Sequence, residues 1–392
     1  MSKAAELAAL IGSQTALSNR NLIINGAMQV AQRGTSETVG PNGTGEGYTV
    51  VDRFQNSLNG SVVSTFTQST DAPSGFANSA KIAITTADSS LGSTEFWHFR
   101  YSAEGQDLQQ IAKGTSDAKA VTLSFWVKSD KTGTYTVELE DTDNSRINSL
   151  AYTVDSADTW EHKTLTFNAD TTGEFTNDNN LSLRINFWLV AGSGYQGGTF
   201  YNGTWGADVD ANRVHSSQVN LGDTVGNEWY ITGIQFEVGE QATPFEHRSM
   251  GDELARCQRY FFNPMAGGNG QSAQISFHSM LNMGGAVSTG NNGHLAFHVP
   301  FPVSMRAAPT LTHDLDNTKI NVGAPSGTQV AFYIQNQGYR DKAGNGNLNT
   351  LSRATGTSAG CLVGTYYISP SALVADQINI GAANQFHFSA EL

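Results

Sequence analysis

The chain has 392 residues, of which 39% are hydrophobic and 10% aromatic, so it has room for two or three domains and enough apolar side chains to bury their cores. This composition excludes a disordered protein. Only 15% of the residues are charged, and the net charge of -13 comes without a basic stripe, which argues against a nucleic-acid partner and favours polysaccharide or protein.

The first 20 residues predict one short amphipathic helix. Its apolar stripe consists of Leu7, Leu10, Ile11 and Leu17. Such a short helix is marginal alone, so we expect it to order only against a larger assembly or sister chains. Glu6 and Gly12 interrupt the apolar run, which is too short for a secretory signal, and no window approaches the length of a membrane span. We therefore expect no membrane insertion.

The two cysteines, Cys257 and Cys361, have no His or Cys partner at metal-ligand spacing. We favour buried thiols over a bridge between them, because cysteine often serves as a small hydrophobic residue. This predicts a chain that folds in a reducing cytoplasm.

Residues 21 to 248 consist of short β-strand patterns bounded by Gly, Asn, Asp and Ser clusters. Examples are SVVSTFTQS, TEFWHFRYS, VTLSFWVKS, TYTVELED, WEHKTLTFN, LSLRINFWLV and WYITGIQFEV. Helical periodicity is almost absent, which predicts a jelly-roll-like β-sandwich. The longest irregular stretch is 191 to 228, and a loop of that length in a compact domain is usually functional or mobile.

Residues 249 to 262 predict a joint helix. Ser249 and Asp252 have the spacing of a capping box, and Asp252 pairs with Arg256 at i,i+4. Beyond the joint, residues 263 to 392 repeat the strand style, with HLAFHVPF, VAFYIQNQGY and CLVGTYYIS among the segments. The predicted fold class is all-β: a short N-terminal helix, a sandwich, the joint helix and a second, smaller β-sandwich domain.

The charge separates these two parts. Residues 251 to 392 hold five Asp and two Glu, balanced by two Lys and five Arg, so the whole net charge lies before residue 251. We therefore expect two different units.

Two strands place a tryptophan on an otherwise polar face, namely Trp126 in VTLSFWVKS and Trp188 in LSLRINFWLV. If both strands lie in one sheet, the two rings form an aromatic platform for a sugar. That platform would be bordered by Lys128, Arg184 and Asn186. The alternative is that the N-terminal segment or a neighbouring subunit covers this face, because tryptophan is highly buried on average.

The stretch from 191 to 228 carries aromatic residues among glycines. These residues are Tyr195, Phe200, Tyr201 and Trp205. They suit glycan stacking or a contact between subunits. Alternatively, they fold back and plug one end of the sandwich.

Candidate metal ligands and catalytic residues give weak signals. The carboxylates of Asp141, Asp143, Asp208 and Asp210 alternate along the chain, but the glycine and bidentate glutamate of a calcium loop are missing, so we expect solvated turns and no metal. Five C-terminal histidines are better explained by polar sheet faces than by a metal site on a trimer axis: His278, His294, His298, His313 and His387.

Catalysis is not predicted. Glu161–His162 and Glu246–His247 are adjacent pairs, but no HExxH or P-loop motif is present. A glycan depolymerase needs two carboxylates across a bond, and 35 acidic residues offer such pairs by chance. We expect no catalytic residue, no enzyme and no cofactor.

Several segments occur in an order typical of one family. NLIINGAMQVAQRGTS, YTVVDRFQ, FWVKS and GIQFEVGEQATPFEHRSMGDELARCQRYFF resemble tail fibre receptor-binding proteins of tailed bacteriophages, especially marine and cyanobacterial phages. The closing GIQxExG, ATPFExR and ELxxCQRYF pieces are the most specific. The resemblance implies a homotrimeric virion protein whose sandwich domain carries or supports a receptor-binding tip. Without a long coiled-coil or β-helical shaft, it would be a short fibre or one subunit of a larger tail assembly.

We therefore predict a phage tail fibre protein that attaches to adaptor, nozzle or baseplate proteins through residues 1 to 20 and binds host surface polysaccharide. A glycan-depolymerising tailspike and a purely structural tail adaptor are the alternatives. An anchored N-terminus makes the C-terminal end distal, so loops there are favoured for host contact over the first-domain aromatics. Their candidate residues are Asn291, Asn292, Asn345 and Asn347.

Overall fold

The chain divides into two compact units, Met1–Leu254 together with Leu392, and Ala255–Glu391. The computed structural model describes residues 19–41, 43–263, 293–307, 309–313, 320–322, 330–334, 360–367, 378–380 and 386–392. The predicted N-terminal helix lies outside these residues. Among the described residues, no helix has the length and apolarity needed to cross a membrane.

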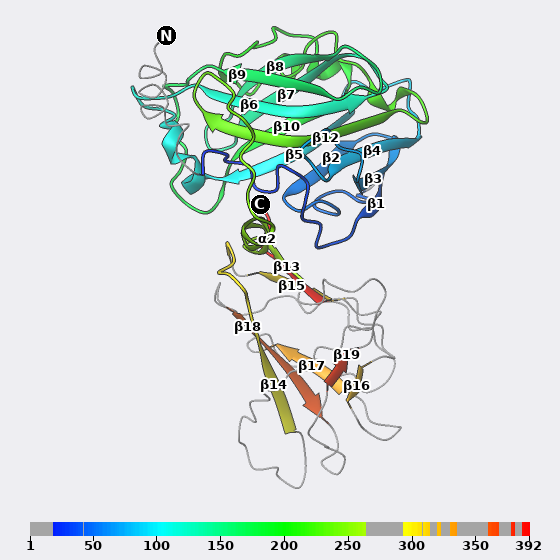
Figure 1. Ribbon diagram of the computed structural model, residues 1–392, viewed down its shortest axis with the longest axis vertical. Coiled ribbons are helices and arrows are strands. Elements are labelled where there is room, and N and C mark those ends of the chain that lie inside the picture. The colour runs from blue at the N-terminus through cyan, green and yellow to red at the C-terminus, as the bar shows by residue number, and fades with distance from the viewer. Residues whose placement is uncertain are drawn as a thin grey trace. The chain divides into compact units, whose positions relative to one another are not determined.

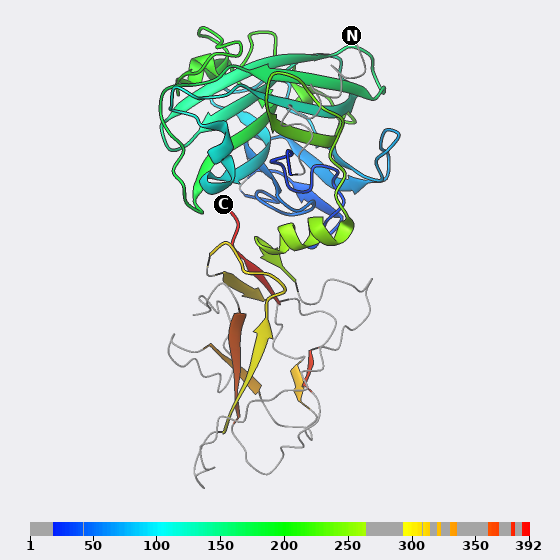
Figure 2. The ribbon, with the colours of Figure 1, turned by 60° about the vertical axis from the view of Figure 1, so that its left-hand side comes forward.

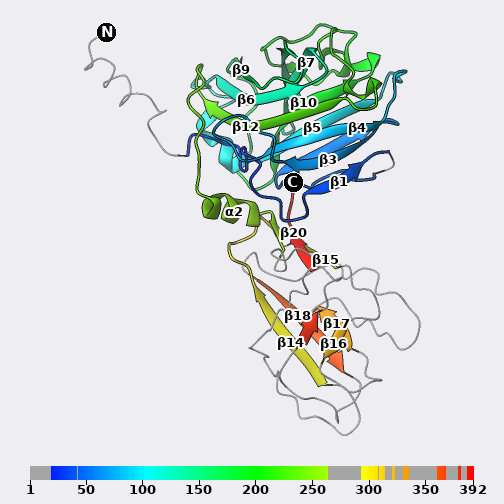
Figure 3. The ribbon, with the colours of Figure 1, turned by 45° about the vertical axis from the view of Figure 1, so that its right-hand side comes forward.

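The first unit is a β-sandwich of two six-stranded sheets whose paired strands run antiparallel (Figures 1 and 3). Sheet A has the order β1 (Ser36–Val39), β3 (Val63–Ser69), β4 (Ser79–Thr86), β12 (Glu228–Val238), β6 (Val121–Ser129), β9 (Glu161–Phe167). Sheet B has the order β11 (Gly206–Ala207), β8 (Arg146–Val154), β7 (Gly133–Asp141), β10 (Leu181–Ala191), β5 (Phe96–Glu104), β2 (Phe54–Asn59). The all-β prediction is confirmed.

The core lies between the two sheets because the strands alternate apolar and polar residues. On β6 the inward residues Val121, Leu123, Phe125 and Val127 are at most 3% exposed. On β10 Leu183, Ile185, Phe187 and Leu189 are at most 1% exposed. The rings of Phe125 and Phe187 meet edge to face with centroids 5.3 Å apart, which joins the two sheets.

The turn after β12 brings two distant segments together. Glu246 accepts hydrogen bonds from the backbone N–H groups of Asn19 at 2.6 Å and Asn21 at 2.9 Å. The Asn21 side chain in turn accepts from the N–H of Phe236 at 3.1 Å and donates to the carbonyl of Ile234 at 3.2 Å. The chain must therefore leave the strand after Val238 so that Glu246 can reach the N-terminal segment.

Arg248 and Glu253 continue this contact. The Arg248 guanidinium donates to the carbonyl of Ile23 and to Glu253, each at 2.9 Å. The other oxygen of Glu253 accepts from the N–H of Asn25 at 2.5 Å. The ATPFExR, ELxxC and NLIIN pieces of the sequence thus form one hydrogen-bonded cluster, which we call the clasp: Asn21, Glu246, Arg248 and Glu253.

Helix α2 (Met250–Gln258) begins as the capping pattern predicts, because the N–H of Asp252 donates to Ser249 Oγ at 3.2 Å. Figure 2 shows α2, in yellow-green, after the extended segment that follows β12. The helix is shorter than the predicted 249 to 262, because Phe261–Phe262 forms strand β13, which pairs with β20 (Phe386–Ser389). Cys257 is buried, and the side chain of Cys361 lies outside the described ones.

The described strands of the second unit form three small antiparallel sheets. The first adds β15 (Thr310–His313) to β13 and β20; the second is β14 (Gly293–Pro300), β18 (Gly360–Tyr367) and β17 (Val330–Ile334); the third is β16 (Ile320–Val322) with β19 (Ile378–Ile380). Short 3-10 turns complete the elements: η2 (Gly105–Ile111), η3 (Ser193–Tyr195), η4 (Asp210–Asn212) and η5 (Leu221–Asp223).

Candidate functional site

The long connection from β10 to β12, residues 192 to 227, is held to the first unit by hydrogen bonds along its length. Gly192 donates to the carbonyl of Glu95 at 2.7 Å, Gly203 to that of Ser149 at 2.9 Å and Val219 to that of Thr134 at 2.9 Å. Strand β11 within it pairs with the edge strand β8. The connection is therefore an ordered part of the sandwich, with the scaffold a binding loop needs.

Arg213 is the main anchor of this connection. Its guanidinium forms two hydrogen bonds with Glu138 on β7, at 2.9 and 2.7 Å, and its Cζ lies 5.8 Å from the ring centre of Trp188 on β10. Such a bidentate pair fixes both distance and orientation. Glu138 and Trp188 are fully buried, so the connection covers this part of the outer face of sheet B.

The buried charges under the connection affect one another. Burial raises the pKa of Glu138, although Arg213 opposes the change. At Glu140 burial acts in the same sense, but Arg184, Arg213 and Arg100 outweigh it and the pKa is lowered. The ion pairs that hold the connection therefore include an ionised Glu140 and a Glu138 whose charge depends on Arg213.

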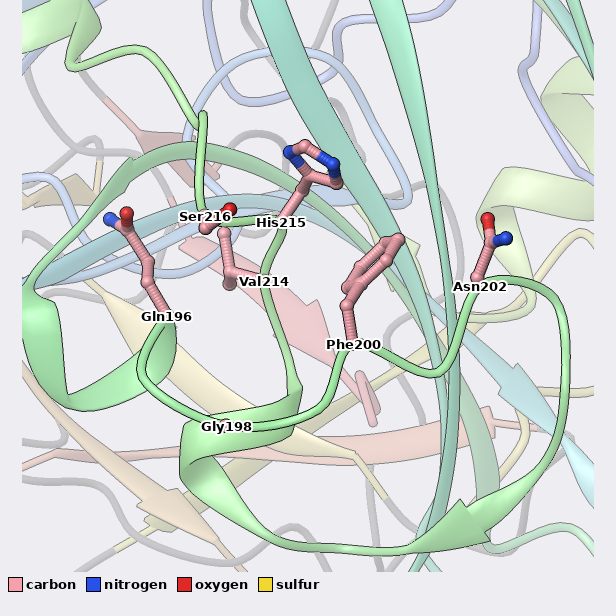
Figure 4. A pocket seen from close by; sticks show the side chains of 7 residues that line it. All are labelled: Gln196, Gly198, Phe200, Asn202, Val214, His215 and Ser216. Atoms are coloured by element: carbon pink, nitrogen blue, oxygen red, sulfur yellow. The ribbon is translucent and has the colours of Figure 1, made fainter.

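A pocket of about 320 Å³ opens within the connection, between the arms 196–202 and 214–216 (Figure 4). Its lining consists of Gln196, Gly198, Phe200, Asn202, Val214, His215 and Ser216. This volume is at the lower end of the range for small-molecule sites, about 300 to 1,000 Å³. No Asp, Glu, Lys or Arg is among these lining residues.

Two rings form the apolar part of the pocket. Phe200 and His215 meet edge to face, with centroids 5.3 Å apart and planes at 86° (Figure 4). His215 Nδ1 accepts the backbone N–H of Ser217 at 3.1 Å, so the neutral imidazole carries its proton on Nε2 as a hydrogen-bond donor.

Backbone approach keeps the two arms of the pocket close. Gly198 donates to the carbonyl of Ala211 at 2.7 Å, and Asn212 Oδ1 accepts from the N–H of Thr199 at 2.8 Å. A Cβ atom on Gly198 would lie 2.0 Å from Asn212 Oδ1 and 2.9 Å from the carbonyl oxygen of Ala211, so a larger residue would require these groups to shift. Gln196 donates its amide to the carbonyl of Ala191 at 2.6 Å, which fixes this side chain at the rim.

This lining combines an aromatic ring with neutral hydrogen-bonding groups. The face of Phe200 offers a surface for the C–H groups of a pyranose ring. The carboxamides of Gln196 and Asn202, the hydroxyl of Ser216 and the imidazole of His215 can bond sugar hydroxyls. The pocket is thus suited chemically to an uncharged polar ring.

The predicted platform of Trp126 and Trp188 does not form. Trp126 lies on β6 in sheet A and Trp188 on β10 in sheet B, so the two rings stand on different sheets. Trp188 is fully buried by the chain's own connection, with the Tyr195 ring 5.1 Å and the His98 ring 4.0 Å away. Trp126 is half-buried. Alternation along a strand defines the face of a side chain but not the sheet that holds it.

The loop aromatics named from the sequence contact the domain itself. Tyr195 packs on Trp188, and the Tyr201 hydroxyl donates to the carbonyl of Ala207 at 2.6 Å. The Trp205 indole donates to the carbonyl of Asn168 at 2.9 Å, and its ring lies 4.9 Å from Lys113 Nζ. None of these three is among the residues that line the pocket.

The acidic turn at Asp141 differs from the expected solvated turn. Asp141 is buried, and its carboxylate contacts Lys113 Nζ at 2.5 Å. The same ammonium lies 3.2 Å from Asp170 and donates to the carbonyls of Thr172 and Gly173. A lysine ammonium thus occupies the position where a hard cation would contact these oxygens. No metal-binding group of three or more His, Cys, Asp or Glu occurs in the described part of the chain.

The other predicted site residues fall outside the described residues: Asn291, Asn292, Asn345 and Asn347. The side chains of the five C-terminal histidines are likewise undescribed. Phe200 was noted among the loop aromatics, but Gln196, Asn202, His215 and Ser216 were missed as pocket residues. Their only signal is their position in the long irregular stretch, since a folded loop has no periodicity to relate its two arms.

No protein-family model and no curated protein matches the chain. Solved structures with some similarity include the enzymatically active domain of tailspike protein 4 from bacteriophage CBA120, with 13% identity and a TM-score of 0.30 over 56% of this chain and 21% of that one. The chain thus spans about a fifth of that domain. The family 11 carbohydrate-binding module of Clostridium thermocellum has 11% identity and a TM-score of 0.26, over 53% of this chain and 98% of the module. The C-terminal family 22 carbohydrate-binding module of Clostridium thermocellum Xyn10B has 10% identity and a TM-score of 0.28, over 58% of this chain and 99% of the module.

One of these comparisons contradicts the expectation that the chain is not an enzyme. The tailspike domain is described as enzymatically active, whereas the other two structures are carbohydrate-binding modules. We therefore withdraw that expectation.

Proposed function

We propose that the chain is a glycan-binding tail fibre protein of a phage, homotrimeric, attached to the tail through its N-terminal residues and presenting β domains to a host-cell polysaccharide. The resemblance of its ordered sequence segments to tail fibre receptor-binding proteins supports the assignment to a virion. The single observation that carries glycan binding is the neutral pocket of the β10–β12 connection, with Phe200 and His215 beside amide and hydroxyl groups.

In this proposal a pyranose ring places its apolar face on Phe200. The N–H at His215 Nε2 donates to a ring hydroxyl, while Gln196, Asn202 and Ser216 at the pocket wall bond the others. The absence of charged side chains from this lining favours a neutral sugar over a uronic or sialic acid. The C-terminal loops that hold Asn291, Asn292, Asn345 and Asn347 remain a second proposed contact.

Native gel electrophoresis of the full chain in gels containing neutral polysaccharides tests the proposal. Xylan, mixed-linkage β-glucan and galactan serve as probes. We expect at least one of them to retard the protein, whereas migration unchanged in every gel would contradict glycan binding. A reducing-end assay on the polysaccharide that retards the protein separates a protein that only binds glycan from a glycan-cleaving tailspike, which would release new reducing ends.

The assembly is tested separately. Sedimentation at micromolar concentration is expected to give a trimer of the 41.9 kDa chain. A species of monomer mass alone would contradict the trimer. Deleting residues 1 to 20 should leave a folded trimer that retains glycan binding but no longer joins the tail, and normal incorporation into virions would contradict the attachment role.

A further inference from the structure

The outer face of sheet A carries a second set of aromatic side chains. Trp126 on β6 lies directly opposite His162 on β9, and their ring centroids are 5.1 Å apart. Trp160, immediately before β9, lies beside Lys128, whose Nζ is 5.6 Å from its ring centre. Trp126 and Lys128 are two residues apart on one strand and share a face, so Trp160 stands diagonally from Trp126 on that face.

Further rings continue this arrangement across the sheet. Phe76 lies 5.0 Å from Phe245 and 5.3 Å from His247, measured between ring centroids. At Gly233 on β12 an added Cβ would lie 2.7 Å from Phe76 Cζ and 3.1 Å from Trp126 Cδ1, so both rings approach this glycine. The resulting aromatic strip consists of Phe76, Trp126, Trp160, His162, Phe245 and His247.

The tryptophan at the edge of the strip is held in place before any ligand arrives. The Trp160 indole donates to Asp71 Oδ1 at 3.1 Å. Asp71 also pairs with Lys128, whose Nζ lies 4.2 Å from the ring centre of Tyr230. Trp126 and Trp160 are each half-buried, so part of each ring remains accessible. A ring whose orientation is already fixed loses little freedom when a ligand binds.

The charges on this face cancel locally. Lys81 pairs with Glu228 at 2.7 Å, and Lys128 pairs with Asp71. Partial burial lowers the pKa of His162, which favours the uncharged imidazole. A face whose cations are each matched by a carboxylate complements a neutral occupant rather than an anionic one.

The side chains of this face also differ from those of a subunit interface. Among the described residues, the large hydrophobic side chains that are exposed are Val209, Val225 and Met250. Val209 and Val225 lie in the β10–β12 connection and Met250 begins α2, so none lies on the strip. The strip has aromatic rings among polar groups and lacks the exposed aliphatic surface that stable oligomer interfaces bury.

We infer that the aromatic strip is a further glycan-binding site, which takes a neutral polysaccharide chain lying along sheet A with sugar rings stacked on Trp126 and Trp160. The inference rests on the proposed function, that the chain binds glycan, but uses residues on the opposite sheet from those that anchor the pocket. The outer face of a sheet offers room for a long chain, whereas the pocket suits a single ring or chain end.

The test uses full-length Trp126→Ala, Trp160→Ala and the double variant in the gels described above, with xylan, mixed-linkage β-glucan, galactan and the anionic polymer alginate. Val225→Ala, at an exposed position away from both sites, is the matched control. We expect the double variant to bind the neutral polysaccharide that retards the wild type about tenfold more weakly. A loss of this size is typical when central aromatic contacts are removed. Trp160→Ala, the change at the edge, should show a smaller loss with an unchanged melting temperature.

Three results would overturn the inference. The double variant could be retarded as strongly as the wild type, or the wild type could prefer alginate to the neutral polymers. Alternatively, Trp160→Ala could sediment as a smaller species, which would make the strip a subunit interface. Retardation of wild type that only Phe200→Ala weakens would also overturn it while leaving the proposed function intact. Failure of every polymer to retard the wild type would contradict both.

Discussion

Arg213 lies over the ring of Trp188 and gives two hydrogen bonds to the buried carboxylate of Glu138. This one side chain joins the β10–β12 connection to sheet B. It also places Val214 and His215, its next neighbours, in the wall of the pocket. The stability of the sandwich and the shape of the pocket are therefore linked through Arg213.

Replacing Arg213 by Ala should lower the free energy of unfolding by about 3–5 kcal/mol, because Glu138 is left buried and unpaired. The loss should be smaller at pH 5 than at pH 8. Burial already raises the pKa of Glu138, so a lower pH favours the neutral carboxyl, which needs no partner, whereas a rising pH favours an uncompensated charge. Urea unfolding at both pH values measures this. An equal loss at both would contradict the pairing.

The double variant Arg213→Met with Glu138→Gln provides the control. It removes the ion pair without leaving a charge behind, so it should recover part of the stability lost in Arg213→Ala. Its pH dependence between pH 5 and pH 8 should also be weaker than that of the single variant.

Lys113→Met should destabilise the first unit by about 3–5 kcal/mol, because the carboxylates of Asp141 and Asp170 would lose their shared cation. The side chains of Lys113 and Asp141 are at most 2% exposed, so water cannot replace the lysine ammonium. Lys119→Met, a few residues away and partly exposed, is the matched control and should change stability little. Thermal unfolding compares the two. Similar melting temperatures would contradict the role of Lys113.

Glu246→Gln should weaken the clasp, because the backbone N–H groups of Asn19 and Asn21 would lose a charged acceptor. Partial burial opposes ionisation, but those N–H groups and Arg248 hold the pKa of Glu246 below its ordinary value of 4.5. The contribution of the carboxylate is thus present above pH 4.5 and lost as the pH falls through the lowered pKa.

The difference in unfolding free energy between wild type and Glu246→Gln should therefore be about 1–3 kcal/mol at neutral pH and should shrink in acid. Glu240→Gln, an exposed carboxylate in the same segment, is the control. A difference that stays constant down to pH 3 would show that the charge of Glu246 does not hold the N-terminal segment.

Gly233→Ala tests the packing of the aromatic strip. Gly233 has φ of 63°, a left-handed conformation that costs roughly 1–2 kcal/mol for other residues. Gly226 has φ of 96° with no atom within 4 Å of an added Cβ, so Gly226→Ala should carry only this conformational cost. Gly233→Ala should cost about 1–3 kcal/mol more, because its methyl meets Phe76 and Trp126. Equal costs in chemical denaturation would refute the close ring packing.

The strands were predictable because their alternation is strong. VTLSFWVKS coincides with β6, and its inward face is buried as the pattern requires. Strands β1 and β11 were not predicted, since they are short and β1 is mostly exposed. Helix α2 stops before Phe261 because Phe261 and Phe262 pair with β20. Local helical spacing carries no information about that distant strand.

The sites were less predictable because they depend on pairing between distant segments. Trp126 was recognised as outward-facing, but its neighbour is His162 on the paired strand β9 rather than Trp188 on the other sheet. In the pocket, Phe200 and His215 come from two arms of one glycine-rich connection. Such contacts follow from the path of a loop, which composition alone does not determine.

The central claim is that the pocket binds a neutral sugar. The most direct measurement is calorimetric titration of the protein with an oligosaccharide cut from the polysaccharide that retards it in the gels. The titration is carried out in the Trp126→Ala/Trp160→Ala background so that the aromatic strip contributes little. Phe200→Ala should raise the dissociation constant about tenfold. Val209→Ala, at an exposed position in the same connection and outside the pocket lining, should leave it unchanged. The same dissociation constant with and without the Phe200 ring, in a protein that still melts at the same temperature, would contradict the pocket as the sugar site.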